Sequence, residues 1–261
     1  MNRREEFEGA FRELFEERWR GSPLFPIVEY ALFPGGKRLR PLLCYAVCTD
    51  LGGASEDALG LAAAVECLHI ASLIHDDLPC LDDDSIRRGQ PTCHVQFGEA
   101  AALLAGDALA SWAFELGTCS PRSQAAVVRA LSRAFVSLCT GQLIEIQKEP
   151  HFSTSKVGIC ELKTGALFGV AMRLGALCAQ GEAPEVELLI DQAGRHFGVL
   201  FQAQDDREDG ESGIVSQEIL INTWSSLSKV FTSLHDKSGR DFLETKSVFE
   251  GALLPRFMVP M

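Results

Sequence analysis

The sequence predicts an all-α protein. Apolar residues recur at helical spacing along most of the chain, the apolar segments are dominated by Ala, Leu, Glu and Gln, and runs of β-branched residues are scarce. The breaks between these segments are short, for example at 51–53 and 120–121. We therefore expect neighbouring helices to pack antiparallel in a bundle.

The expected elements follow from these patterns. In residues 3–20, an amphipathic helix is indicated by Phe7, Phe11, Leu14 and Phe15, which share one face. Further helices are expected at 38–52, 56–77, 98–118, 121–147, 155–180 and 184–207. The segment 58–74 is apolar on most faces, so its helix should lie in the middle of the bundle. After Gly210 the chain becomes more polar and richer in Ser and Thr, and no strong motif follows.

Composition limits the class of protein. A chain of 261 residues with 46% hydrophobic and 23% charged residues can bury one large core or two smaller ones. The net charge of −12 argues against a nucleic-acid-binding protein. No unbroken run of 18 apolar residues is present, so we expect no membrane-spanning helix.

The cysteines and the first residues bear on the compartment. Nine cysteines, an odd number scattered through apolar segments, indicate reduced thiols and an intracellular or organelle interior. The first twenty residues are charged and rich in Glu, which fits neither a secretory signal nor a transit peptide.

The acidic cluster near position 205 predicts a metal site. Asp205 and Asp209 are four residues apart and share one face of a helix, with Asp206 beside them. Like charges at this spacing destabilise a helix by about 0.2–0.5 kcal/mol. A divalent cation would offset that cost, and Mg²⁺ typically takes one or two carboxylates together with water and phosphate oxygens.

The acidic cluster at 76–84 leaves two interpretations open. Asp76 and Asp82 are six residues apart, and Pro79 between them breaks a regular helix. Either a bulge at 78–80 brings Asp82 back beside Asp76, or the helix ends at Leu78 and a solvated acidic loop follows. An EF-hand is excluded, because no Gly stands at loop position 6 with Glu at 12.

Cationic residues stand near both clusters. Lys37 and Arg40 are three apart and share one face of a helix expected to begin after two glycines, and Lys163 opens a later helix. Arg87 and Arg88 follow the first cluster. Each group alone fits a basic surface turn, but together they predict a polyanion held between Mg²⁺ and Arg or Lys side chains.

These motifs resemble the trans-prenyltransferases, most closely plant geranylgeranyl diphosphate synthases and their small subunits. The matching stretches are GGKRLRP (35–41), residues 66–115, ELKTGALF (161–168) and FGVLFQAQDD (197–206), within a region of about 25–210. The resemblance implies an all-α isoprenoid-synthase bundle with a central cavity, usually dimeric. We expect residues 1–261 to form a single domain, with a divergent and shortened C-terminal region at 211–261.

The resemblance also implies roles for individual residues. The metal-binding residues would be Asp76, Asp77, Asp82, Asp205, Asp206 and Asp209. The residues that bind isopentenyl diphosphate would be Lys37, Arg40, His69 and Arg88. The residues that bind the allylic diphosphate would be Arg87, Lys163, Thr164 and Gln202. In such a site Mg²⁺ and cations stabilise the departing diphosphate, and no nucleophilic side chain is needed.

The sequence departs from active members of the family after its second acidic motif. Those members continue with Gly-Lys, Lys-Asp and Lys-Thr-Tyr-Pro-like elements, and none of these is present here; Lys229, Lys237 and Lys246 lack the surrounding pattern. Arg207 stands where an apolar residue is usual and is expected to pair with a carboxylate and compete with Mg²⁺. Such losses would lower the rate by about a thousandfold or more.

This combination resembles the non-catalytic small subunits. They carry Cys-x-x-x-Cys motifs, of which Cys44 and Cys48 form one, whereas the second is not matched because Leu174 stands four residues before Cys178. From spacing alone, Cys44 and Cys48 fit a packed core or a subunit interface.

The sequence leaves three functions open for this chain. The first is a regulatory subunit, non-catalytic or weakly active alone, in a plastid heterodimer with a catalytic geranylgeranyl diphosphate synthase. The second is an active Mg²⁺-dependent synthase with a C10 to C20 product, in which Ala71, five residues before Asp76, leaves the cavity floor open. The third is a metal-dependent phosphohydrolase, suggested only by the pair His75-Asp76.

Overall fold

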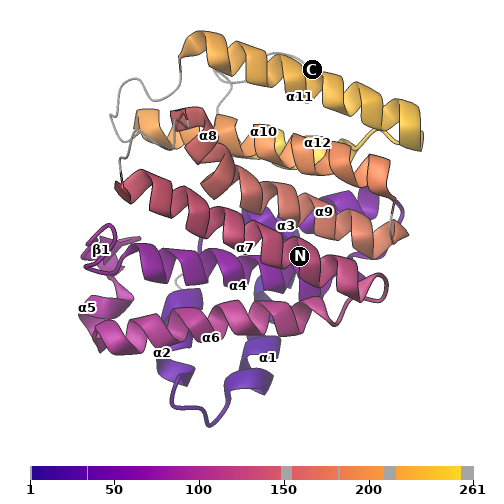
Figure 1. Cartoon of the computed structure of the whole chain (residues 1–261). Coiled ribbons are helices and arrows are strands. Elements are labelled where there is room, and N and C mark those ends of the chain that lie inside the picture. Colours follow the sequence, from indigo (N-terminus) through magenta and orange to yellow (C-terminus); the bar gives the residue numbers. More distant parts are fainter. Residues whose placement is uncertain (1, 34, 148–154, 182, 209–215, 254–261) are drawn as a thin grey trace.

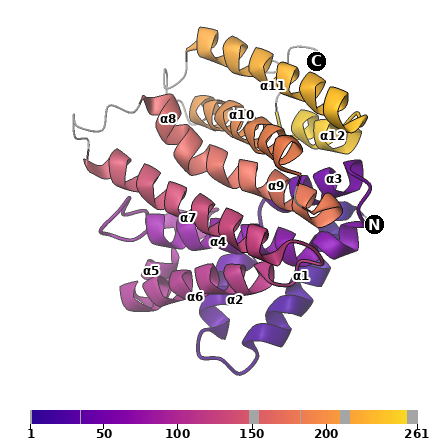
Figure 2. The ribbon, with the colours of Figure 1, turned by 45° about the vertical axis from the view of Figure 1, so that its right-hand side comes forward.

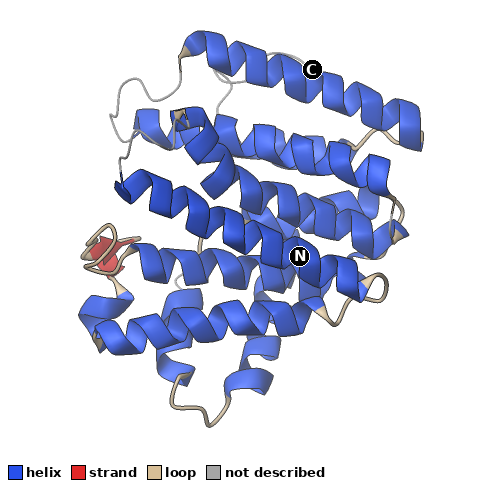
Figure 3. Cartoon of the chain, in the orientation of Figure 1, coloured by secondary structure: helices blue, strands red, loops and turns tan. Residues whose placement is uncertain are grey.

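The protein is an all-α bundle, as predicted. The structure, a computed structural model, describes residues 2–33, 35–147, 155–181, 183–208 and 216–253 (Figure 1). These residues are helical almost throughout, apart from one small two-stranded ribbon (Figure 3). The α-helices are α1 (Arg3–Trp19), α2 (Phe25–Leu32), α3 (Leu39–Asp50), α4 (Leu59–Asp76), α5 (Cys93–Phe97), α6 (Glu99–Gly117), α7 (Gln124–Gln147), α8 (Lys156–Cys160), α9 (Ala166–Gln180), α10 (Pro184–Glu208), α11 (Gln217–Ser238) and α12 (Leu243–Ala252).

Four shorter elements lie between these helices in the described part of the chain. A 3₁₀ helix at Ser55–Ala58 leads into α4, and a π-helical turn at Glu161–Gly165 joins α8 to α9. The strands β1 (Ile86–Arg87) and β2 (Gln90–Pro91) pair antiparallel between α4 and α5. The ribbon and the π-helical turn both contribute residues to the cavity described below.

Helix α4 lies inside the bundle. It packs against α3, α6 and α9, and Figures 1 and 2 both show it between α6 and α7. Leu61, Leu68 and Ile70 are among its fully buried side chains. This placement confirms the expectation from the apolar segment 58–74. In α1, the expected apolar face is confirmed by Phe7, Phe11 and Phe15, which are completely buried.

Part of the polar C-terminal region is helical. Residues Gln217–Ser238 form α11, which lies on α10 at one edge of the molecule (Figures 1 and 2). Trp224, Leu227, Phe231 and Leu234 are buried and recur every three or four residues, so a helical pattern was present among the serines and threonines. Helices α2, α5 and α12 were also not predicted.

The described part of the C-terminal region shares a core with the rest of the chain. The rings of Phe197 in α10 and Phe249 in α12 stack with centroids 4.1 Å apart. Asp50, at the end of α3, caps α12 by accepting hydrogen bonds from the backbone N–H of Glu244 (3.1 Å) and Thr245 (2.9 Å). These contacts join α12 to α3 and α10, and the single domain stays a prediction.

The two cysteines of the Cys-x-x-x-Cys motif lie in the core of this chain. Cys44 and Cys48 are on α3 and have no exposed surface, and Gly175 of α9 packs against their backbone. The structure therefore favours the core interpretation of the motif over the interface interpretation, because neither thiol is accessible to a second chain in this packing.

Three helical stretches are long and apolar enough to cross a membrane, by length and composition alone. They are Ser55–Asp76, Gln124–Gln147 and Lys156–Gln180. The requirement for 18 consecutive apolar residues was too strict to detect them, because a few polar residues interrupt each one. Most of the apolar window of two of them is buried inside the bundle, 67% for Ser55–Asp76 and 72% for Lys156–Gln180. For Gln124–Gln147 the buried share is 39%.

The contact between α3 and α9 gives a stability prediction. A Cβ at Gly175 would lie 2.3 Å from the carbonyl oxygen of Cys44, so Gly175→Ala should lower the free energy of unfolding by about 2–3 kcal/mol. A Cβ at Gly9 in α1 would have no other atom within 4 Å, so Gly9→Ala should raise the free energy of unfolding by about 0.5–1 kcal/mol. Urea denaturation of both variants tests this, and equal effects would contradict the packing.

Candidate active site

A cavity of about 770 Å³ opens between the ends of several helices. Its walls come from the loop before α3, the second half of α4, the β1–β2 ribbon, the π-helical turn and the end of α10. Among the described residues, seven Lys or Arg and three Asp or Glu side chains line it, a formal excess of four positive charges. Such a cavity suits a polyanion.

A smaller apolar cavity of about 260 Å³ adjoins it between α4 and α7. The large cavity and the small apolar cavity share four lining residues, so they are adjacent: Ser72, Asp76, Leu138 and Lys163. Ala71, which we expected to set the floor, is completely buried and lines neither cavity.

The loop before α3 is held by a buried ion-pair network around Arg38. Arg38 has a left-handed backbone (φ 50°), which directs its side chain inward, and only 2% of the residue is exposed. It donates to Glu66 (2.6 Å), to Glu8 (2.8 and 3.2 Å) and to the carbonyl of Leu32 (2.6 Å). Helix α3 therefore begins only at Leu39, and Lys37 precedes it instead of sharing a helical face with Arg40, which corrects the sequence prediction.

Arg40 is a partly buried cation without a full set of partners. It lines the cavity with its guanidinium 4.4 Å from the ring centroid of Phe168, and its Nε has no hydrogen-bond partner. Burial, together with the nearby Arg88, lowers the pKa of Arg40 to about 10, and the group stays charged at neutral pH. A charged guanidinium that lines a cavity with an N–H left unsatisfied favours binding of an anion.

His69 is neutral in this environment. Burial holds the pKa of its imidazole well below the usual value, and Arg40 and Arg88 lower it further. Arg88, from the turn after β1, also donates a hydrogen bond to the carbonyl of Gly35. A Cβ at Gly36 would lie 2.9 Å from the Arg88 guanidinium, so glycine permits this close approach. His69, Arg40, Arg88 and the exposed Lys37 all line the cavity, as expected.

The first acidic cluster folds back on itself. Helix α4 ends at Asp76, and the backbone N–H of Asp82 donates to the carbonyl of Asp76 over 2.9 Å. Each of the two interpretations is confirmed in part. The helix ends and an exposed acidic loop follows, as the second had it, yet the turn returns Asp82 to Asp76, as the first had it. Burial, with added repulsion from Asp82, raises the pKa of Asp76 to about 6, although Lys163 opposes the shift. Asp82 also accepts a hydrogen bond from Gln142 of α7 (2.9 Å).

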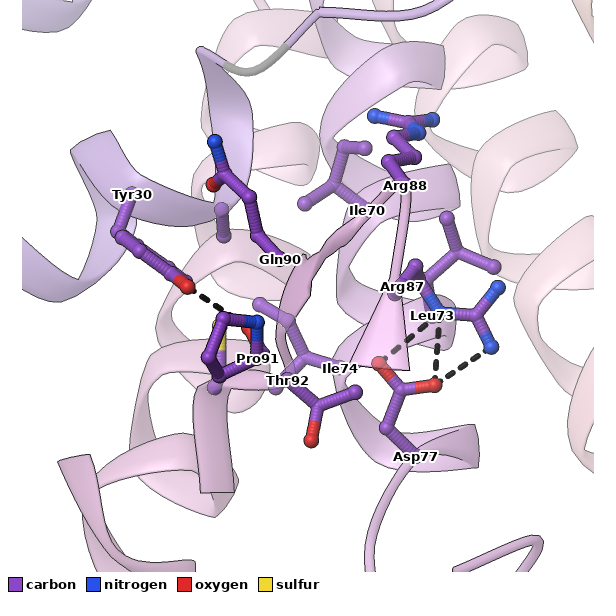
Figure 4. Close-up of a pocket in the computed structure, with 12 residues that line it drawn as sticks. Tyr30, Ile70, Leu73, Ile74, Asp77, Arg87, Arg88, Gln90, Pro91 and Thr92 are labelled. Carbon is purple, nitrogen blue, oxygen red and sulfur yellow. Dashed lines mark hydrogen bonds and ion pairs between the residues drawn. The ribbon is translucent and has the colours of Figure 1, made fainter. Parts of the chain in front are cut away.

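Asp77 faces away from the large cavity. It is 3% exposed, and its carboxylate accepts hydrogen bonds from Arg87 Nε at 2.7 and 2.9 Å (Figure 4). Figure 4 shows this pair on one side of a small pocket, with Tyr30 and Pro91 on the opposite side. The pair thus fixes Arg87, which lines both spaces, whereas Asp77 is not among the residues lining the large cavity.

The second acidic cluster lies at the end of α10, across the cavity. Asp205 lines the cavity, while Asp206 is buried and accepts a hydrogen bond from Gln202 (2.8 Å). Gln202 in turn accepts one from Thr164 (2.8 Å), and both Gln202 and Thr164 line the cavity. One carboxylate oxygen of Asp206 is buried without a hydrogen bond. Asp209 lies outside the described residues.

Lys163 and Thr164 project from the π-helical turn. The sequence suggested that Lys163 opens a helix, but helical structure runs without a break from Lys156 to Gln180. The wider turn changes the direction of the side chains locally, and such turns are frequent at functional sites. Lys163 pairs with Glu145 of α7 at 2.5 Å and lines the cavity.

The arrangement suits Mg²⁺ bound together with a phosphate ligand. Within the described ranges, no group of three or more His, Cys, Asp or Glu side chains could hold a metal ion by itself. Mg²⁺ instead commonly takes one or two carboxylates and completes its shell with water and phosphate oxygens. Asp76 and Asp205 line the cavity and provide such carboxylates, whereas Asp82, whose backbone bonds to that of Asp76, is exposed and is not among the lining residues.

The lysines after α10 do not reach the cavity. Lys237, near the end of α11, pairs with Glu185 at the start of α10, far along the helix from Asp205. Lys246 lies 5.3 Å from the ring centroid of Phe231, and Lys229 is exposed on α11. None of the three is among the residues that line the cavity.

Sequence reasoning missed several residues around the cavity. Arg4 of α1 lines it, and Arg38 and Glu66 form its buried base. Glu66 gave a signal in the sequence, because a single carboxylate in an apolar central helix must be paired when buried. Arg4 gave none.

Comparison with known proteins agrees with this geometry. Residues 22–213 match the polyprenyl synthetase family. The chain belongs to the polyprenyl synthetase family. A solved structure of an FPP/GFPP synthase from Zymomonas mobilis superposes with a TM-score of 0.82 at 29% identity, covering 95% of this chain and 96% of that one. The expected isoprenoid-synthase bundle is thereby confirmed.

Two relatives indicate the range of family members that the chain resembles. It is 40% identical over 209 residues to a farnesyl diphosphate synthase of Haemophilus influenzae, covering 76% of this chain and 71% of that protein. It is 43% identical over 194 residues to the heterodimeric geranylgeranyl pyrophosphate synthase large subunit 1, chloroplastic, of Arabidopsis thaliana. That match covers 69% of this chain and 52% of the relative, so the chain spans about half the length of this plant protein.

The lowered pKa of His69 predicts a pH effect on stability. Below about pH 6.5 the unfolded chain binds a proton that the folded chain excludes, so this residue lowers the free energy of unfolding as the pH falls, by up to about 1.4 kcal/mol per pH unit. His69→Gln should remove that part of the acid sensitivity.

Urea unfolding at pH 5 and pH 7.5 measures this effect. The matched control is His235→Gln, because His235 is exposed on α11. If both variants lose stability between the two pH values as the unchanged protein does, His69 is not held neutral.

Proposed function

We propose that this chain is a regulatory subunit of a heterodimeric prenyl diphosphate synthase. It would bind a catalytic geranylgeranyl diphosphate synthase subunit and alter that partner's activity, product or location, while being inactive or weakly active alone. The observation that carries this proposal is the position of Lys229, Lys237 and Lys246, none of which lines the diphosphate cavity.

The cavity retains the means to bind a diphosphate. Lys37, Arg40, His69 and Arg88 line it and would hold isopentenyl diphosphate. The allylic diphosphate would meet four other lining residues, Arg87, Lys163, Thr164 and Gln202. Neutral His69 would donate or accept one hydrogen bond without adding charge.

Asp76, Asp82 and Asp205 are the residues that would hold Mg²⁺, which stabilises negative charge on a departing diphosphate when it is bound. Asp206 would orient Gln202, and Asp77 would orient Arg87 through the ion pair. A role for Asp209 and competition of Arg207 with Mg²⁺ remain predictions.

The partner and the compartment are inferred from relatives. A relative named as the large subunit of a heterodimeric synthase is 43% identical, so a protein of that kind is a reasonable partner. Its name also includes chloroplastic, and a plastid location is proposed for this chain, although bacterial farnesyl diphosphate synthases match as well.

A second function is an independent Mg²⁺-dependent prenyl diphosphate synthase. The observation in its favour is that most of the residues implied by the family resemblance do line one cavity, with an apolar space beside it. The phosphohydrolase alternative has no comparable support, since His75 contacts the carbonyl of Leu103 (3.2 Å) on α6 and the chain matches another family.

A paired assay distinguishes these functions. Radiolabelled isopentenyl diphosphate, an allylic diphosphate primer and Mg²⁺ are given to this chain alone and to its mixture with a catalytic plant geranylgeranyl diphosphate synthase. The chain alone should be slower than the catalytic subunit by about a thousandfold or more, because lysines that would stabilise the leaving group are missing from the cavity. The mixture should co-elute in size-exclusion chromatography and show a changed rate or product ratio.

The control is the same mixture with Asp76→Asn in this chain. If the change in product ratio persists, it comes from the partner's active site. Turnover by the chain alone at the partner's rate, abolished by Asp76→Asn, would refute the regulatory proposal and establish the independent synthase.

A further inference from the structure

The first helix contributes a cation to the diphosphate cavity. Arg4 of α1 is among the residues lining it, about thirty positions before the first family motif. The rest of α1 is anchored elsewhere, because Phe7, Phe11 and Phe15 pack into the core. The position of Arg4 is therefore fixed by a helix that is itself well held.

Two local features set that position. A capping box at Asn2, with Glu5 bonded back to its backbone N–H, starts α1 at Arg3. Arg4 and Glu8 are four residues apart and lie one turn from each other on the same face. Glu8 forms two hydrogen bonds with Arg38 (2.8 and 3.2 Å), so the face carrying Arg4 is tied to the loop that carries Lys37.

Arg4 differs from the other arginines near it. Arg3, Arg12, Arg18 and Arg20 each pair with a glutamate, at 2.8 to 3.2 Å. Within the described part of the chain Arg4 has no ion pair, and it stands at a cavity that already has an excess of positive charge. Arg4 is exposed, so water can solvate its guanidinium, and an anion bound in the cavity would give it a partner of opposite charge.

We propose that Arg4 is a further diphosphate-binding residue, which contacts the phosphate oxygens at the rim of the cavity beside Gly35, Lys37 and Arg88. This proposal rests on the proposed function of the cavity as a diphosphate site. Helix α1 thus brings a cation to the cavity, whereas the described helices α11 and α12 bring none. A guanidinium suits this role, because its planar set of donors matches two phosphate oxygens at once.

Calorimetric titration with inorganic pyrophosphate in the presence of Mg²⁺ tests the proposal. Arg4→Ala should raise the dissociation constant by about tenfold, since a hydrogen bond to a charged group is worth at least that much and exposure at the rim reduces it. Arg4→Lys keeps the charge without the paired donors and should recover part of the loss. Arg18→Ala is the matched control, because it lies on the same helix and pairs with Glu115 outside the cavity.

The outcomes separate this inference from the proposed function. Thermal unfolding of Arg4→Ala should match that of Arg18→Ala, which shows that a loss of affinity is not a loss of structure. If Arg4→Ala binds pyrophosphate as the unchanged chain does while Arg40→Ala binds weakly, the role of Arg4 is refuted and the diphosphate site stands. If the unchanged chain does not bind pyrophosphate, the site itself is refuted and Arg4 with it.

Discussion

The cavity depends on the buried ion pairs of Arg38. A guanidinium with 2% exposure is tolerable only because Glu66, Glu8 and the carbonyl of Leu32 satisfy it. Removing one partner of such a network typically costs about 3–5 kcal/mol, because the other charge stays buried alone. The network joins α1, the loop before α3 and α4, and it leaves the neighbouring cations Lys37 and Arg40 free to line the cavity.

The helices that were predicted are those whose apolar residues form long, regular patterns. Helices α1, α4 and α10 were expected within a few residues of their observed limits. The short helices α2 and α5 follow prolines or glycines and are stabilised by packing, which propensity does not report. Helix α11 was missed because its serines and threonines obscured a regular set of large apolar residues that pack on α10.

The site was predictable as a set of residue types but not as a geometry. Motif spacing identified the cations and carboxylates that line the cavity. It could not show that Arg87 turns Asp77 away, since that depends on the pairing of the β1–β2 ribbon. Nor could it show that Gln202 donates a hydrogen bond to Asp206. The π-helical turn that carries Lys163 was also not predictable, because the wider turn changes the direction of side chains without changing the sequence pattern.

Binding of a Mg²⁺–diphosphate in this cavity can be tested with a crystal structure of the chain grown with inorganic pyrophosphate and Mn²⁺, whose anomalous signal locates the metal. We expect a diphosphate contacting Arg40, with metal beside Asp76 or Asp205. A structure with neither ion in the cavity, at concentrations that saturate an active family member, would contradict it.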